Sequence, residues 1–514
     1  MLSSQRGLHR AAFAIVGATI LSQLLALLRD RLLAGIFGVG NELDVYYAAF
    51  RVPDLIFVSA ASLFSATVVI PFLAERVGTG ERAGMLMSSL LRSFLWVMTV
   101  VLLVAFAVMP WLAPLVAPGF GADVQHMLIM FSRILLLSPL LLGLSGIIAG
   151  ATQVYRHFVL FSLTPVVYNC GIIAGIVFLA PSLGVAGVVW GVVLGALAHV
   201  LIQVPVVVHH QLIQKGATQV GTVWRVVKTS IPRTIALSLT QIQIAALTAF
   251  ASLLASGSIT TFQLAYNLQS IPLSLVGVSY SVAAFPALAL LWAQAAKHDF
   301  LKNVRRAEGH IIVWSLLFAA LFVLLREQIV GVVLGVGAIQ ARDVKMIADV
   351  MGMFALSLAP QGLVLLYTRA FYAARHTAIP LLAHTMGVAT TLVCAYLFLP
   401  RFAYPVMVLA GSFSIGMIVT TLILMLFFWL RIGPLSHIHL WLKTLGGVII
   451  GVIVTDIMFS FYARFIDTGS VIGEFAVSFL AGIDGLALAF VYLFVFGAGP
   501  AVDIVEMCVR RWRR

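Results

Sequence analysis

The sequence predicts an all-α polytopic membrane protein with about 14 transmembrane helices. Hydrophobic residues make up 62% of the 514 residues, charged residues only 10%, and the mean hydropathy is +1.10. A chain of this composition has too little polar surface to cover a water-soluble core. Its apolar runs of about 20 residues are continuous, as in helices that cross a bilayer, whereas strands of a membrane barrel alternate polar and apolar positions in pieces of about 10.

The first span is predicted near residues 10–28. A basic N-terminal segment precedes this run, as in a signal peptide. The run is long for a signal core, however, and "RDR" (29–31) follows it instead of a small-residue cleavage pattern. We therefore interpret it as a retained span.

The remaining spans are predicted from apolar runs bounded by charge, Pro and Gly. In chain order they lie near 45–73, 86–113, 128–152, 158–180, 185–208, 231–255, 261–291, 307–334, 347–374, 378–399, 405–430, 441–463 and 470–497.

The chain contains the same plan twice. "VVIPFLAE" (68–75) ends the second span and "AAFPALAL" (283–290) the eighth, while "ATQVYRH" (151–157) follows the fourth span and "AFYAARH" (370–376) the tenth. Six spans separate the two members of each matched pair. This constant offset predicts two six-helix lobes related by an axis along the membrane normal. We predict an N-lobe at 1–212 and a C-lobe at 213–431 that starts with a basic linker. Two accessory helices at 432–499 and a basic tail at 500–514 follow.

Basic residues predict the orientation. Most of the 31 Lys and Arg residues lie in the two tails or in loops on the side of the N-terminus. The positive-inside rule then places both termini in the cytoplasm of a multi-pass protein. This topology and attraction to anionic lipid account for the net charge of +13, so we expect no nucleic-acid partner.

The sequence offers little chemistry for an enzyme. No span carries paired carboxylates, a Ser/Lys or Ser/His set, or His-x-x-Glu-His metal spacing. The three cysteines show neither pairing nor metal-type spacing. We expect no catalytic residue, no cofactor and no metal, and the coupling ion or membrane potential is undetermined.

Charge is concentrated in one stretch, residues 29–54, which contains Arg29, Asp30, Asp44 and Asp54. Its motif "RDRLLAGIFGVGNELDVYYAAFRVPDL" (29–55), together with "APGFGAD" (117–123) and "FASLLASGSITTF" (250–262), resembles the MurJ/MviN family of bacterial lipid II flippases.

The resemblance implies a member of the MOP exporter superfamily, with two lobes in a V-shape around a water-filled cavity. Its substrate would be lipid II, the undecaprenyl-diphosphate-linked disaccharide pentapeptide, moved from the inner to the outer leaflet of the cytoplasmic (inner) membrane for cell-wall synthesis. The two accessory helices would form the groove for the lipid tail. We expect a monomer that contacts membrane lipids, with cell-wall synthesis proteins as candidate further partners.

Guanidinium groups suit such a substrate, because their planar fork matches phosphate oxygens. Arg29 and Asp30 stand at the family's Arg-Asp, and Asp44 and Asp54 match its acidic positions. The sequence departs from the family pattern where other cavity arginines are expected, at Gln23, Phe57, Val58 and Asn267. Either the substrate is held differently, or residues such as Arg51 and Arg133 substitute.

The predicted site therefore combines retained and substituted positions. Substrate-binding candidates are Arg29, Asp30, Asp44, Arg51, Asp54, Gln23, Asn267 and Gln241, and gating or hinge candidates are Gly35, Gly38, Gly40 and Pro53. Structural alternatives stay open: Arg29 can snorkel to the interface, Asp44 can pair with Arg29 as a tie, and Arg51 and Asp54 can neutralise each other on one helix face.

Other functions also stay open. The missing arginines favour an exporter of another lipid-linked oligosaccharide or an amphipathic compound. A transport-inactive scaffold for cell-wall synthesis is the third alternative.

Overall fold

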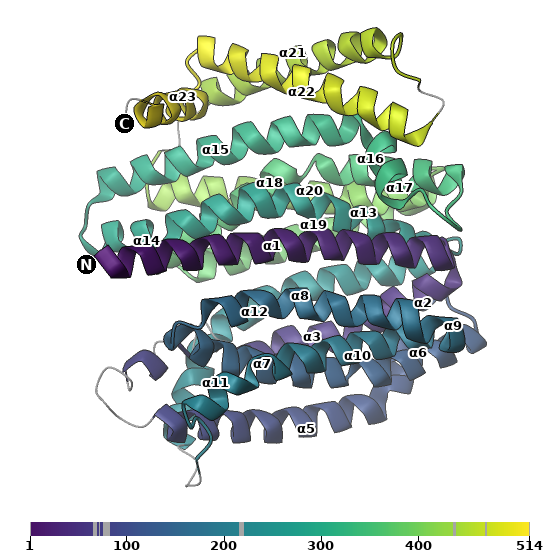
Figure 1. The fold of residues 1–514 in the computed structure, drawn as a ribbon, viewed down its shortest axis with the longest axis vertical. Helices are drawn as coiled ribbons and strands as arrows, with labels where there is room; N and C mark the ends of the chain where they lie inside the picture. The colour runs from purple at the N-terminus through teal and green to yellow at the C-terminus, as the bar shows by residue number, and fades with distance from the viewer. Residues whose placement is uncertain are drawn as a thin grey trace. The chain divides into compact units, whose positions relative to one another are not determined.

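The computed structural model describes residues 2–64, 69–70, 72–75, 83–214, 220–434, 438–467 and 470–512. Every regular element within these ranges is a helix, which confirms the all-α class. The chain forms two compact units, residues 1–260 and 261–514 (Figure 1).

The first unit contains the helices up to the turn near residue 257. They are α1 (Leu2–Phe37), α2 (Asn41–Ala49), α3 (Arg51–Ser59), η1 (Ala61–Phe64), α5 (Ala83–Val116), α6 (Ala122–Leu135), α7 (Leu137–Val154), α8 (Phe158–Ala174), η2 (Gly175–Leu179), α9 (Ala180–Leu183), α10 (Val185–Leu201), α11 (Val204–His209) and α12 (Val220–Ser252).

The second unit contains the other helices, of which α13 starts at the boundary. They are α13 (Ser258–Leu273), η3 (Ser274–Val278), α14 (Ser279–Ala293), α15 (Lys297–Leu324), α16 (Arg326–Leu334), α17 (Ala341–Ala355), α18 (Leu358–Ala373), α19 (Ala378–Phe398), η4 (Leu399–Arg401), α20 (Pro405–Arg431), α21 (Ile438–Tyr462), α22 (Val471–Val495) and α23 (Gly499–Trp512).

The described residues include 10 helices that are long and apolar enough to cross a membrane, or 11 when α17 and α18, bent by 43°, count as one span. The other predicted spans are 10–28, 45–73 and 231–255. They coincide with α1, with the broken segment α2–α3–η1 and with α12, so the structure is consistent with about 14 spans.

The units divide at 260, whereas the predicted lobes divide at 212. The reason is α12, which packs on α3, α5 and η1 of the first unit. The predicted accessory helices correspond to α21 and α22, which pack on each other and, within the second unit, on α15 and α16 respectively.

The two predicted Arg-His turns have the same geometry. Arg156 and Arg375 both adopt left-handed backbone, with φ of 62° and 60°. In each turn the following histidine donates its N–H five residues back, His157 to Thr152 O and His376 to Phe371 O, as in a Schellman helix end. Gln211 and Ala295 form the same kind of helix end, so the shared geometry is not specific to the two Arg-His turns, and the repeat stays a prediction.

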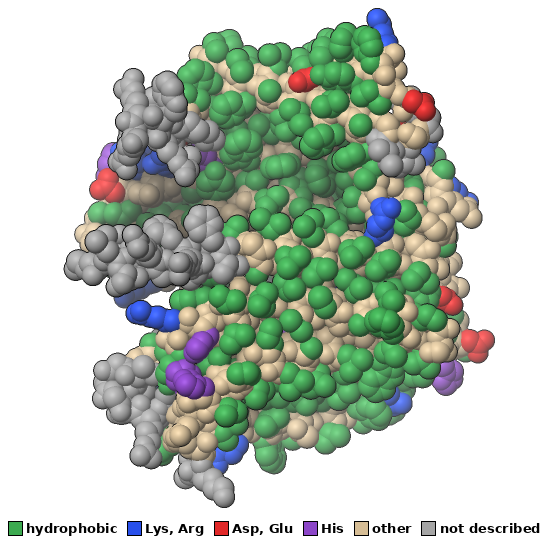
Figure 2. Space-filling model, viewed as in Figure 1, with side chains coloured by type: hydrophobic (Ala, Val, Ile, Leu, Met, Phe, Trp, Pro, Cys, Tyr) green, Lys and Arg blue, Asp and Glu red, His purple; other side chains and the backbone are tan. Residues whose placement is uncertain are grey.

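Apolar side chains cover much of the face seen in Figure 2. Large exposed examples are Trp96, Trp111 and Leu115 on α5 and Phe178 in η2, all more than 70% exposed. In water this surface would drive aggregation, whereas in a bilayer it is the lipid contact.

Candidate functional site

The charged stretch folds as the end of α1, a tight turn and two short helices. Gly35 lies inside α1, which continues without a break to Phe37. Gly38 ends the helix with φ of 67°, a conformation that favours glycine, and its N–H donates to Ala34 O. Gly40 has extended backbone and precedes α2.

A helix break at Phe50 separates α2 from α3, and Pro53 explains its position. Proline has no N–H to donate and its ring clashes with the carbonyl four residues earlier, here Ala49. Ala49 is the last residue of α2. Pro53 thus sits in the first turn of α3, where a missing donor costs little.

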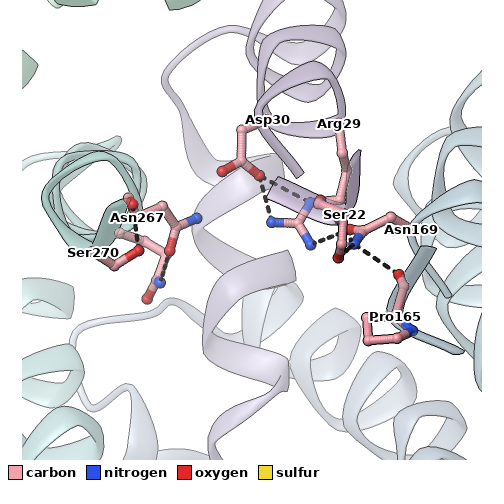
Figure 3. A network of polar contacts seen from close by, with 8 residues as sticks. Ser22, Arg29, Asp30, Pro165, Asn169, Asn267 and Ser270 are labelled. Carbon is pink, nitrogen blue, oxygen red and sulfur yellow. Dashed lines mark hydrogen bonds and ion pairs between the residues drawn. The ribbon is translucent and has the colours of Figure 1, made fainter. Parts of the chain in front are cut away.

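Arg29 is the centre of a polar network inside the first unit (Figure 3). Its Nε and Nη2 donate to Asp30 Oδ1 at 3.0 and 2.8 Å, and its Nη1 donates to Asn169 Oδ1 at 3.2 Å. The Arg29 side chain is 20% exposed and that of Asp30 5%. These bonds use three of the five guanidinium N–H donors, and the other two meet no acceptor among the described residues.

Helix α8 holds Asn169 in place. The Asn169 amide donates to Ser22 Oγ at 3.3 Å and to Pro165 O at 3.0 Å. Pro165 leaves the Phe161 carbonyl without its usual partner, and Thr164 Oγ1 donates to that carbonyl at 2.8 Å. Arg29 is therefore fixed by neighbours that are themselves hydrogen-bonded. Sequence reasoning missed Asn169, although a lone amide four residues after Pro165 in an apolar span was a visible signal.

Asp44 does not pair with Arg29. Its carboxylate is 2% exposed and accepts three hydrogen bonds of 2.7 Å, from the Gly257 N–H, the Thr260 N–H and the Thr260 hydroxyl. Gly257 has φ of 88°, and a Cβ there would lie 2.5 Å from the Val39 side chain. Asp44 thus ties the start of α2 to residues 257–260, at the start of α13.

Arg51 and Asp54 lie in the first turn of α3. Arg51 is buried, with 8% of its surface exposed. The two residues are three positions apart on α3, and their mutual neutralisation stays a prediction.

Two polar clusters lie within the second unit. Gln263 donates to Asn267 Oδ1 at 2.8 Å, and the Ser270 hydroxyl donates to Asn267 O at 2.6 Å (Figure 3). Separately, the buried Gln361 amide donates to Gln269 Oε1 and to Ser357 Oγ.

Gln23 and Gln241 are both half-buried. Neither forms a hydrogen bond with another described residue. The described ranges contain no group of three or more His, Cys, Asp or Glu side chains placed to hold a metal ion.

A helical membrane fold with a largely buried Arg–Asp ion pair on its first helix is a feature of secondary transporters. Solved structures share the fold. The chain is similar to "Lipid II flippase MurJ, inward closed conformation", with a TM-score of 0.78, 21% identity and coverage of 96% of this chain and 99% of that one. It also resembles an inward-facing multidrug resistance MATE transporter of the MOP superfamily, with a TM-score of 0.68, 14% identity and coverage of 82% and 98%.

Sequence comparison identifies the family. The profile described as "Lipid II flippase MurJ" matches residues 33–480. Relatives include "Lipid II flippase MurJ" of Burkholderia cenocepacia, 27% identical over 82% of this chain and 83% of that protein, and "Probable lipid II flippase MurJ" of Thermotoga maritima, 24% identical over 71% and 74%. The chain belongs to the MurJ family, and the predicted resemblance is confirmed.

Proposed function

We propose that this protein translocates lipid II from the inner to the outer leaflet of a bacterial cytoplasmic membrane by alternating access, with both termini in the cytoplasm. The observation that carries the proposal is the family match over residues 33–480. The buried Arg29 network agrees with it.

In this proposal Arg29 binds the diphosphate. Asp30 and Asn169 fix the plane of the guanidinium, and its two remaining N–H donors are offered to phosphate oxygens as a fork. Asp30 also offsets the cost of keeping the cation within the spans when no substrate is bound.

The proposal is tested by complementation. Depleting the resident lipid II flippase of a host bacterium while supplying this chain should preserve growth and outer-leaflet lipid II. Arg29→Gln should abolish rescue. Arg29→Lys should rescue poorly, since it keeps the charge but loses the fork. Arg401→Gln, which removes the same charge at an exposed position, is the matched control.

Absence of rescue by a well-expressed wild type, together with absence of lipid II binding to the purified protein, would overturn the proposal. The second candidate, an exporter of another lipid-linked oligosaccharide or amphipathic compound, is favoured by Gln23, Phe57, Val58 and Asn267 at positions where arginines are expected. If this second candidate is correct, the purified protein should bind a different polyprenyl-linked glycan and should not bind lipid II.

A further inference from the structure

A cavity of about 280 Å³ lies where α15, α21 and α23 meet, within the second unit. Most of its charged lining is basic. The ionisable side chains that line it are Arg305, Arg306, His439, Lys443 and Asp503. Figure 2 shows Lys, Arg and His atoms on this side of the unit, next to α23.

Part of the positive charge is compensated within the protein. Arg306 Nε donates to Asp503 Oδ2 at 2.9 Å, and His310 Nε2 lies 3.5 Å from the same oxygen. Arg305 Nη2 donates to Pro434 O at 2.6 Å. The Nε of Arg305 is buried and has no acceptor among the described residues.

Lys443 is not compensated in this way. It is half-buried on α21, and none of the ion pairs found among the described residues involves it. The α21 and α23 helices also begin at this cavity, at Ile438 and Gly499, and their N-termini add partial positive charge. The cavity is therefore suited to an anion.

The surface next to the cavity is apolar. On α21, the side chains of Leu442, Leu445 and Ile449 are 61%, 45% and 59% exposed. The cavity is smaller than the pockets of about 300–1,000 Å³ that enclose drug-sized ligands. It fits a headgroup, while the chains attached to that headgroup would lie on the exposed face of α21.

We infer that this cavity binds the phosphate headgroup of an anionic glycerophospholipid, with Lys443 as its main cation. In the proposed orientation this end of the unit faces the cytoplasm. Basic pockets between helices on that side of a membrane are known to hold anionic lipid headgroups. The inference concerns a structural or regulatory lipid, so it goes beyond the proposed transport function and can fail independently of it.

The test is native mass spectrometry of the full-length protein titrated with phosphatidylglycerol and, separately, with phosphatidylcholine. The wild type should prefer phosphatidylglycerol. Lys443→Gln should weaken the first phosphatidylglycerol binding step by about fivefold, as expected for one lysine near an anionic headgroup, and should leave phosphatidylcholine binding unchanged.

Two variants separate a binding role from folding or bulk charge. Lys302→Gln removes the same charge from an exposed position on α15 outside the cavity, and should leave the preference intact. Lys443→Arg keeps the charge and should retain most of the preference for phosphatidylglycerol. Equal loss in Lys302→Gln and Lys443→Gln, or a wild type without preference, would overturn the inference. Displacement of phosphatidylglycerol by soluble glycerol phosphate at equal concentration would also overturn it, because the site would then hold a soluble anion.

Discussion

Asp44 shows how a single buried carboxylate can be structural in a stretch whose charge suggests substrate binding. Its two oxygens accept from two backbone N–H groups and one hydroxyl, all at 2.7 Å. Hydrogen bonds to a charged group contribute about 1.5–3 kcal/mol, roughly twice as much as those between neutral groups. The tie holds the turn at 257–260 against the start of α2.

Asp44→Asn is therefore expected to destabilise the protein by about 1–3 kcal/mol, because an amide NH₂ would face one of the three donors. The measurement is thermal unfolding in detergent. Glu42→Gln is the control, since Glu42 is exposed and lies two residues before Asp44 on α2. Equal unfolding temperatures for the two variants would show that the three bonds contribute nothing measurable.

His210 is a second residue whose surroundings set a measurable property. It lies just after the span 185–209, stacks on Tyr155 with ring centroids 3.8 Å apart, and its Nε2 is 3.2 Å from His157 Nε2. Burial lowers the pKa of His210 below its usual 6.5, and the neighbouring His209 and His157 lower it further.

A lowered histidine pKa means that the unfolded chain takes up protons more readily than the folded one. The contribution of His210 to stability is thus complete above about pH 6.5 and declines as the pH falls below it. The unfolding temperature should drop between pH 7.5 and 5.5, and His210→Gln should reduce this drop. His376→Gln, at an exposed turn, should not reduce it. Identical pH profiles for wild type and His210→Gln would contradict this account.

Helices α8 and α10 illustrate packing at the level of whole elements. The backbone of α10 approaches α8 and its continuation η2 so closely that a Cβ at Gly191 would lie 2.7 Å from Gly175 Cα in η2 and 3.1 Å from Gly171 O in α8. Small residues at such crossings allow close van der Waals contact where no hydrophobic effect drives helices together.

Gly191→Ala should therefore destabilise the protein by about 1–3 kcal/mol through overpacking, despite the higher helix propensity of alanine. Gly146→Ala on α7 is the matched control, because its Cβ would meet no atom within 4 Å. That variant should be neutral or slightly stabilising in the same thermal unfolding assay. A stable Gly191→Ala variant would mean that α8 and α10 can move apart at little cost.

For the whole molecule, the distribution of Lys and Arg makes a prediction about topology. Because basic residues gather in the tails and in the loops on their side, both ends should lie in the cytoplasm. A green fluorescent protein fused after Arg514 should fluoresce, and alkaline phosphatase at the same place should be inactive. Phosphatase fused after Phe120, in the loop between α5 and α6, should be active. The reverse pattern would invert the proposed orientation.

The sequence by itself determined the class of the protein, the approximate positions of its spans and the family, because these depend on hydropathy, length and the order of motifs along the chain. Only the tertiary structure decided which distant groups meet: Asn169 with Arg29, Gly257 and Thr260 with Asp44, and α12 with the first unit. Such pairings depend on how the helices cross. Many crossings of apolar helices satisfy the same hydropathy pattern, because the lipid-facing and protein-facing sides are both apolar. The sequence around a single buried amide or carboxylate therefore does not identify its partner before the helices are packed.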